Sequence, residues 1–414
     1  MKRNGHSILL LLFVWIYSLS GLSAQGLYGF GPPDTTGPFG ADKWQWGGYL
    51  KNMQVINHLP AFEQSTFTTF FHHRLNARWS PNEHWSLGWE QRTRFFIGDD
   101  VRLNPLFGGQ LEMDPGIVDA SWVPWEGKAA LLHSRVERLW VAYEQPNWEL
   151  RIGRQRINWG VHLVWNPNDL FNAFNFLDFD YAERPGADAI RFLAYLPNGH
   201  SLEAAWEPSL DAEDWQADQV RARGHTAALR YGLPIGSYDV QMIAGWRISD
   251  FVLASGWAGN LGLSGFKGEL AWFRASDPDP GVDRDAVTGT VSFDRSFDQP
   301  IYAMVGLLYT SRGATDQLTA SDLGTFAMPS PTLLSPARWT GIGQVTWSVT
   351  PLLGLDASVL YGPGPNLFIV FPSLRYNIAN DWDVSVTGQL FWLDDAAGLT
   401  RQADAAFIRF TWSY

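Results

Sequence analysis

The chain has 414 residues, a formal net charge of −12 and no cysteine; 15% of its residues are aromatic and only 17% are charged. Without cysteine it has no disulfide framework, thiolate metal site, cysteine nucleophile or lipoprotein anchor. The acidic charge disfavours nucleic acid as a partner, because nucleic-acid-binding surfaces are basic. The low charge content indicates that much of the surface faces something other than water.

Residues 1–24 have the pattern of a secretory signal peptide. Lys2 and Arg3 precede an apolar run from Ile8 to Leu19, and Ser23-Ala24 forms a small-residue cleavage site. The alternative is an uncleaved anchor helix, but the apolar run is shorter than the ~20 residues that a spanning helix needs. Residues 25–46 are then expected to form an N-terminal periplasmic tail or a short plug.

From residue 47 onward, polar and apolar residues alternate with the period of two that is typical of β-strands. In residues 65–80, for example, Phe67 and Phe71 share one parity while Thr68 and Arg74 share the other. The expected strands are 47–57, 65–80, 84–98, 131–145, 148–160, 187–197, 200–208, 224–234, 237–248, 250–258, 264–275, 286–296, 300–311, 337–349, 352–361, 366–377, 381–393 and 404–414.

The connections between these strands alternate between short and mostly longer ones. Short ones include 81–83, 146–147, 198–199 and 350–351; the long ones are 99–130, 161–186, 209–223, 276–285, 312–336 and 394–403. This asymmetry is typical of outer-membrane barrels, which have short periplasmic turns and longer outer loops. The strands are also long enough to cross a bilayer at a tilt.

The sequence therefore predicts an all-β fold: one transmembrane antiparallel up-and-down β-barrel over residues 47–414, with about 18 strands. The alternative is 16 strands, because one outer connection within 249–263 is nearly absent. An aromatic-rich secreted β-sandwich is the rival architecture, but its core could not readily absorb this many long strands and tryptophans.

The last strand carries a second sign of a membrane barrel. Phe410, Trp412 and Tyr414 share a parity, and the chain ends on an aromatic residue. This ending resembles the terminal strand of Gram-negative outer-membrane barrels. The resemblance implies an insertion signal for the barrel-insertion machinery, an outer-membrane location, and contact with membrane lipid and lipopolysaccharide.

In a transmembrane barrel the polar parity faces the lumen, and the early strands place many arginines there. The expected pore-lining arginines are Arg74, Arg78, Arg92, Arg94, Arg151, Arg154, Arg156, Arg191 and Arg230. They would attract anions, or pair with Glu90, Glu137 and Glu149 to stiffen the lumen, and the two roles are compatible. The later strands are mostly neutral and polar there, with Thr288, Thr290, Ser292, Thr340, Gln344, Thr346 and Ser358.

The stretch "RIGRQRINWG" (151–160) conflicts with a regular strand. In an unbroken register Arg154 and Arg156 would face lipid with Ile152, and an arginine at the membrane midplane costs ~2–4 kcal/mol. A β-bulge at Gly153 would shift the parity and turn both arginines into the lumen. Ile157 and Trp159 would then face lipid, and Gln155 would point outward.

The long connection 161–186 is rich in both aromatic and acidic residues. We expect it to fold inward as a constriction loop, which buries its phenylalanines and turns its acids toward the arginines. Those acids are Asp169, Asp178, Asp180 and Glu183. The alternative is an external loop that packs on its neighbours.

One region also resembles known channels. "LRIGRQRINWG", followed by "NPNDLF" and "RPGADAIRF", resembles the strand and loop of porin-like barrels and, more loosely, of alginate-export-type outer-membrane channels. In the latter, such a strand contributes lumen arginines for an anionic polysaccharide. The resemblance covers about residues 148–192, and its matching positions are Arg154, Gln155 and Arg156.

The predicted function is a porin-like outer-membrane channel for passive diffusion of small hydrophilic solutes, with anions and carbohydrates as the candidate classes. The alternatives are a barrel enzyme and a structural or adhesive barrel without conductance. Catalysis is disfavoured because His133 and Ser134, as adjacent strand residues, point to opposite faces. The acidic stretch 277–285 lacks the glutamate of a calcium loop, so no metal or cofactor is expected. The oligomeric state stays open.

Overall fold

The computed structural model describes residues 43–60, 63–114, 116–172, 186–208, 225–276, 278, 283–318, 330–395 and 398–414. The first half contains β1 (Trp44–Leu59), β2 (Gln64–Trp79), β3 (Trp85–Gly98), β4 (Ser121–Glu126), β5 (Ala130–Gln145), β6 (Trp148–Gln155), β7 (Ala187–Tyr195), β8 (Ser201–Glu207) and β9 (Thr226–Ile235). The second half contains β10 (Tyr238–Arg247), β11 (Asp250–Leu261), β12 (Ser264–Ala275), β13 (Asp285–Ser296), β14 (Ile301–Thr310), β15 (Trp339–Ser348), β16 (Leu353–Gly362), β17 (Leu367–Ala379), β18 (Trp382–Asp395) and β19 (Gly398–Ser413).

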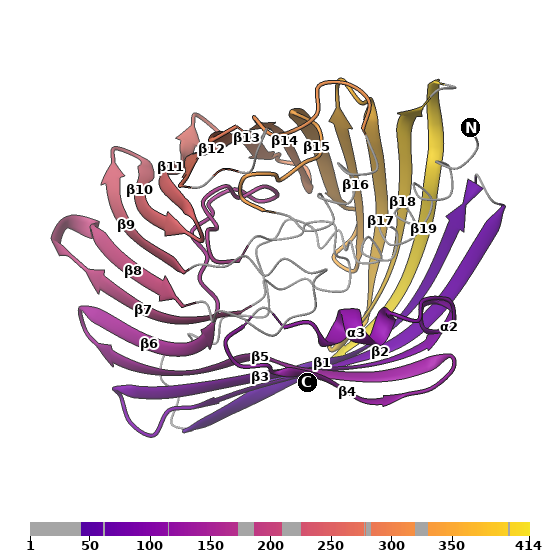
Figure 1. Cartoon of the computed structure of the whole chain (residues 1–414), viewed down its shortest axis with the longest axis horizontal. Coiled ribbons are helices and arrows are strands. Elements are labelled where there is room, and N and C mark those ends of the chain that lie inside the picture. Colours follow the sequence, from indigo (N-terminus) through magenta and orange to yellow (C-terminus); the bar gives the residue numbers. More distant parts are fainter. Residues whose placement is uncertain are drawn as a thin grey trace.

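These strands form one antiparallel sheet that closes on itself (Figure 1). Closure occurs between the first and last strands, where Leu50 of β1 lies opposite Trp412 of β19. Because β3 pairs directly with β5, β4 is an additional strand on β5 and the ring itself has 18 strands. The prediction of 18 strands is confirmed. The 16-strand alternative is wrong, because a two-residue turn at Ile248 and Ser249 joins β10 to β11.

The two rims of the barrel differ in the length of their connections. On one rim the turns have two to five residues, as at 146–147, 236–237 and 380–381. On the other rim lie the long connections 99–129, 156–186, 208–225 and 311–338. The first of these was expected to be a plain loop. It instead contains α2 (Asp99–Leu103), α3 (Phe107–Glu112) and β4, and a 3-10 turn (Pro197–Gly199) occupies one connection of the short-turn rim.

Side chains alternate across the barrel wall as the sequence pattern predicts. On β2, Phe67 and Phe71 are 49% and 43% exposed on the outside, whereas Thr68 and His72 are buried on the inside. The same pattern on the other strands gives the barrel an outer belt of apolar and aromatic side chains. Hydrocarbon solvates such a belt and water does not, so the geometry is that of a transmembrane barrel.

Among the described residues, no α-helix has the length and hydropathy needed to span a bilayer. The expected signal peptide, residues 1–24, and most of the expected tail or plug, residues 25–46, lie outside the described residues.

Candidate functional site: the barrel lumen

Arginine and glutamate side chains form a paired network on the inner face of β2, β3 and β5. Glu90 lies between Arg74 and Arg138, and the Arg138 Nη1–Glu90 Oε1 distance is 3.1 Å. Arg92 pairs with Glu137 at 2.7 Å, and both side chains are nearly fully buried. Further ion pairs and stacking contacts include Arg78 with Glu144 and the Arg94 guanidinium over the Phe96 ring.

A second chain of ion pairs runs across β6 to β9. Glu149 bridges Arg151 and Arg191 at 3.2 and 3.1 Å. Glu203 bridges Arg191 and Arg230 at 2.5 and 2.6 Å. We call the whole set the ionic wall: Arg74, Arg78, Arg92, Arg94, Arg138, Arg151, Arg191 and Arg230, with Glu90, Glu137, Glu144, Glu149 and Glu203. The pairing expected from the sequence is present here, and arginines outnumber glutamates eight to five in this set.

The inner face of β13 to β18 is different, because most of its polar side chains are short and neutral; Asp294 and Asp356 are among the exceptions. Thr346 Oγ1 donates to Asp356 at 2.6 Å, and the Ser373 and Thr387 hydroxyls lie 2.9 Å apart. We call this surface the hydroxyl wall; its buried members are Thr288, Thr290, Ser292, Thr340, Gln344, Thr346, Ser358, Ser373, Ser385, Thr387 and Gln389. The seven residues expected here from the sequence are all on it.

The described part of the long connection, residues 156–172, is held against the inside of β10 to β12. A single wall carboxylate tethers it: Glu269 of β12 accepts hydrogen bonds from the backbone N–H groups of Val161, His162 and Asn168 at 2.6, 2.9 and 2.9 Å. Gln241 of β10 donates to the Trp159 carbonyl at 2.5 Å. We call residues 156–172 the inner segment. It therefore runs from the end of β6 along the inside of the barrel to β10 and β12.

Apolar packing also holds the inner segment in place. Ile157 and Trp159 are each 1% exposed and pack with Leu170 and Phe171. The wall beneath them supplies small inward side chains: Ala187, Ala189, Ala205, Ala228, Ala271 and Ala286. The expectation that Ile157 and Trp159 face lipid is wrong, because β6 ends at Gln155 and the chain turns inward there.

Asp169 is the only expected constriction acid that lies within the described residues; Asp178, Asp180 and Glu183 lie outside them. Asp169 is 1% exposed, and its Oδ1 accepts hydrogen bonds from the backbone N–H groups of Trp159 and Gly160 at 2.9 and 2.7 Å. These contacts fix the fold of the inner segment itself. A role for the acids in ion selection stays a prediction.

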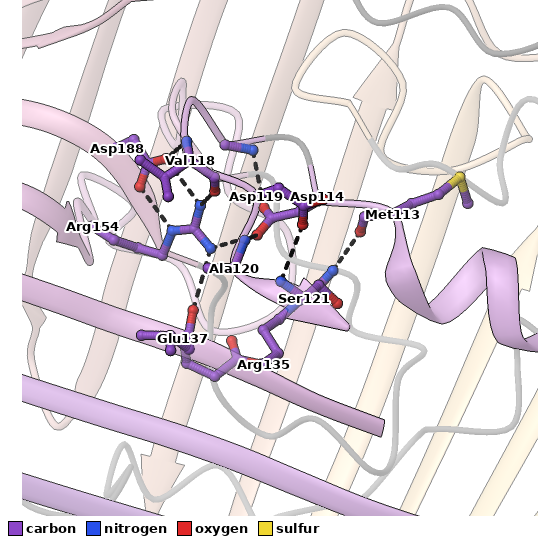
Figure 2. Close-up of polar contacts among 12 residues, drawn as sticks. Met113, Asp114, Val118, Asp119, Ala120, Ser121, Arg135, Glu137, Arg154 and Asp188 are labelled. Atoms are coloured by element: carbon purple, nitrogen blue, oxygen red, sulfur yellow. Dashed lines mark hydrogen bonds and ion pairs between the residues drawn. The ribbon is translucent and has the colours of Figure 1, made fainter. Parts of the chain in front are cut away.

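Arg154 stands next to the last residue of β6, on the same parity as Ile152, in a clamp of its own (Figure 2). Its guanidinium pairs with Asp188 of β7 and Asp114 before β4 at 2.7 and 2.6 Å. It also donates to the Val118 and Val136 carbonyls at 2.7 and 3.2 Å. Figure 2 shows Asp188, Asp114 and Val118 converging on the Arg154 side chain. Arg154 is 7% exposed and joins the connection before β4 to the barrel wall.

The bulge expected at Gly153 is absent, because the pairing of β6 with β5 and β7 continues through Gly153 and Arg154 without a shift. The irregularity is instead a positive φ of 116° at Gly153. A Cβ there would lie 2.3 Å from the Leu139 carbonyl oxygen, so only glycine fits. Gln155 was expected to point outward, but it is fully buried and donates to the Ala189 carbonyl at 2.9 Å. Arg156 is half-buried.

The predicted insertion signal lies on the outside of the closure seam. Phe410, Trp412 and Tyr414 are 44%, 38% and 41% exposed. Tyr414 exchanges backbone hydrogen bonds with Gly48 at 3.0 Å in both directions. On β5, His133 is fully buried and contacts Ser121, whereas Ser134 bonds Gln91 on the outside. His133 and Ser134 therefore lie on opposite faces, as the sequence predicts.

Sequence reasoning missed the anchoring carboxylates. Glu269 has the inward parity of its strand, but nothing in the sequence connects it to the inner segment about 100 residues away. Asp114 and Asp188 were not expected to be site residues, although Asp188 lies within the quoted stretch "RPGADAIRF". The one available signal for these carboxylates was Arg154 directly after Gly153 in an apolar strand. If such an arginine is buried, it requires acidic partners.

Asp100 and His162, which both lie outside the strands, have shifted pKa values. Burial, with the neighbouring Asp99 adding repulsion, raises the pKa of the Asp100 carboxyl in α2 to about 6, although a Thr68 hydrogen bond opposes the shift. Burial and the charge of Lys267 lower the pKa of His162 in the inner segment to about 4. His162 is therefore neutral at pH 7, and its ring Nδ1 accepts from the Val164 N–H at 3.4 Å.

The fold matches solved structures of Occ proteins. OccAB4 from Acinetobacter baumannii has a TM-score of 0.57 at 10% identity, with 90% of this chain and 99% of that chain covered. OccK11 (OpdR) from Pseudomonas aeruginosa has a TM-score of 0.55 at 11% identity, with 89% and 95% covered. OccD3 (OpdP) from the same organism has a TM-score of 0.52 at 10% identity, with 89% and 91% covered. No family model and no curated protein sequence matches the chain. At this identity the likeness shows a shared barrel fold.

Proposed function

We propose that this barrel is an outer-membrane channel for passive diffusion of small hydrophilic solutes, with a preference for anions. One observation carries the proposal: a closed 18-strand barrel is apolar outside, while its inner face carries the ionic and hydroxyl walls. A ring of this size encloses a wide interior. The Occ proteins, which share the fold, are outer-membrane porins, and that likeness supports a channel over an enzyme.

The anion preference rests on the excess of arginine in the ionic wall. Each of its glutamates is engaged by one or two arginines, so the surplus charge of this surface is positive. Arg230 is the most open arginine among these pairs, with a 24% exposed side chain. Guanidinium groups attract carboxylates and phosphates and can bind them with two parallel hydrogen bonds.

Carbohydrate is the second candidate solute class, and the hydroxyl wall favours it. Hydroxyl and amide side chains can exchange hydrogen bonds with a neutral polyol without holding it by charge. The same proposal includes the outer membrane of a Gram-negative bacterium as the location, lipopolysaccharide as a lipid contact, and Phe410, Trp412 and Tyr414 as the signal for the insertion machinery.

The test is current measurement in planar bilayers. We expect discrete conductance steps and a reversal potential in a salt gradient that indicates mild anion preference. Arg230→Ala should lower that preference, whereas Thr340→Val on the hydroxyl wall should leave it unchanged. Absence of conductance in the folded protein contradicts the channel, and an unchanged reversal potential in Arg230→Ala contradicts the role of the ionic wall. Arg154 is unsuitable for this test because it holds the clamp.

A further inference from the structure

The outer belt of the barrel has one polar sector. Six outward residues on β1, β2 and β3 carry amide, hydroxyl or imidazole groups: Asn52, Gln54, Thr69, His73, Gln91 and Thr93. They lie inside the apolar belt and not at its rim, because outward apolar residues flank them on the same strand. Thr69, for example, lies between Phe67 and Phe71. We call these six residues the polar sector.

The belt on β14 to β18, which follow one another in the ring before the closing strand β19, shows how unusual this is. On β14 to β18, every outward position between the strand-end aromatic residues is apolar, glycine or proline. Val305, Leu307 and Val345 are typical, with 59%, 43% and 48% exposed. Lipid-facing polar residues are costly in hydrocarbon, so a cluster confined to one sector requires an explanation.

The polar sector satisfies only part of its own hydrogen-bonding capacity. Gln54 Nε2 donates to Asn52 Oδ1 at 2.9 Å, and Gln91 Nε2 donates to the Ser134 hydroxyl at 2.9 Å. Each amide nitrogen carries two N–H donors. Within the described residues these contacts use one N–H donor of Gln54 and one of Gln91. The second N–H donor of each amide therefore remains on a lipid-facing surface without water.

We propose that the polar sector is a self-association surface through which two copies of this chain form a dimer in the membrane. The axis of the dimer is a twofold parallel to the membrane normal. An identical chain presents the same residues at the same depth, which lipid headgroups do not reach. The sector also holds no Asp, Glu, Lys or Arg and offers both donors and acceptors, so it is complementary to itself.

The geometry selects a dimer over a larger ring. A cyclic trimer joins two different patches on each subunit, whereas a twofold contact joins a patch to its own copy. The described wall has one polar sector, and the belt on β14 to β18 offers no second one. Polar side chains that hydrogen-bond across the contact stabilise association within a bilayer.

Because the chain has no cysteine, single-cysteine variants test the contact directly. Phe71→Cys places a thiol at the centre of the sector, opposite Asn52 on β1 and Phe95 on β3, and leaves all six polar residues intact. Val345→Cys on β15 is the matched control, because the two native side chains are similarly exposed, at 43% and 48%. Both variants are reconstituted at low density in phosphatidylcholine vesicles and oxidised with copper phenanthroline.

We expect a covalent dimer for Phe71→Cys and at least about tenfold less for Val345→Cys, because only the polar sector places a residue near its own copy. Adding Asn52→Leu and Gln91→Leu to the Phe71→Cys variant should abolish most of the dimer. If that protein fails to fold, Thr93→Val provides the milder substitution. Equal cross-linking of both single variants, or none at Phe71→Cys, overturns the proposal.

Two further outcomes distinguish other occupants. The wild-type protein in mild detergent should have twice the mass of one chain by light scattering, and a trimer overturns the twofold contact. Loss of the Phe71→Cys dimer when lipopolysaccharide is added to the vesicles also overturns it, in favour of a lipid occupant. None of these readouts involves conductance, so a failure here is separate from a failure of the proposed channel.

Discussion

The ionic wall and the hydroxyl wall line the same lumen but are held in place by different interactions. In the ionic wall, long side chains from neighbouring strands are held by shared carboxylates, as Glu203 holds Arg191 and Arg230. In the hydroxyl wall, short side chains such as Ser373 and Thr387 bond only to close neighbours. In the ionic wall, the charges that would select solutes therefore also stabilise the barrel. In the hydroxyl wall, the side chains that would contact solutes contribute little to stability.

The largest difference between the walls should appear in stability. Glu203 is 2% exposed and serves two arginines. Glu203→Ala leaves both without their shared partner, which we expect to cost about 3–5 kcal/mol. Thr387→Val on the hydroxyl wall removes one neutral hydrogen bond and should cost about 1 kcal/mol. Urea unfolding in lipid vesicles measures both. Equal losses would show that the walls are not energetically different.

The sequence was sufficient for the fold because period-two alternation, turn positions and strand length depend on local residues. The inward side chains of β2 and β13 were predicted on this basis. The sequence was insufficient for the inner segment, whose position depends on Glu269, a carboxylate far along the chain. Parity also gave the wrong face for Trp159, because parity applies only while the strand continues, and β6 ends at Gln155.

The Arg154 clamp at the end of β6 provides a second comparison. Arg154→Lys keeps the charge but loses the fork that reaches Asp188, Asp114 and two carbonyls at once. We expect a loss of about 2–3 kcal/mol on the same unfolding scale, because at least one buried partner is left unsatisfied. Arg102→Lys, at an exposed side chain, is the control and should unfold as the wild type does. A wild-type value for Arg154→Lys contradicts the clamp.

Asp100 should make the free energy of unfolding depend on pH. Its carboxyl pKa lies near 3.8 in the unfolded chain and is raised to about 6 in the folded protein, so the folded state binds the proton more tightly. This contribution to stability is complete below pH 4 and is lost as the pH rises through 6. Asp100→Asn should therefore stabilise the protein by about 2–3 kcal/mol at pH 7.5.

At pH 3 the Asp100→Asn and wild-type proteins should unfold at similar urea concentrations, because Asp100 is then largely protonated in both its folded and unfolded forms. Asp298→Asn, at an exposed turn, is the matched control and should show no such crossover. If Asp100→Asn has the same advantage at both pH values, the effect is one of packing and not of titration.

The smallest expected effect is local. Glu269→Gln keeps the shape of the tether but replaces charge-assisted hydrogen bonds to three backbone N–H groups with weaker ones, and its new N–H₂ group opposes at least one donor. Each 1.4 kcal/mol lost shifts the balance between docked and released inner segment by about tenfold. Global unfolding should change little, because the barrel wall does not depend on the segment.

Brief steps of higher conductance should appear in single-channel records of Glu269→Gln, and Asp356→Asn on the hydroxyl wall should not produce them. Records identical to wild type would mean that apolar packing on the alanines, and not the carboxylate, holds the segment across the lumen.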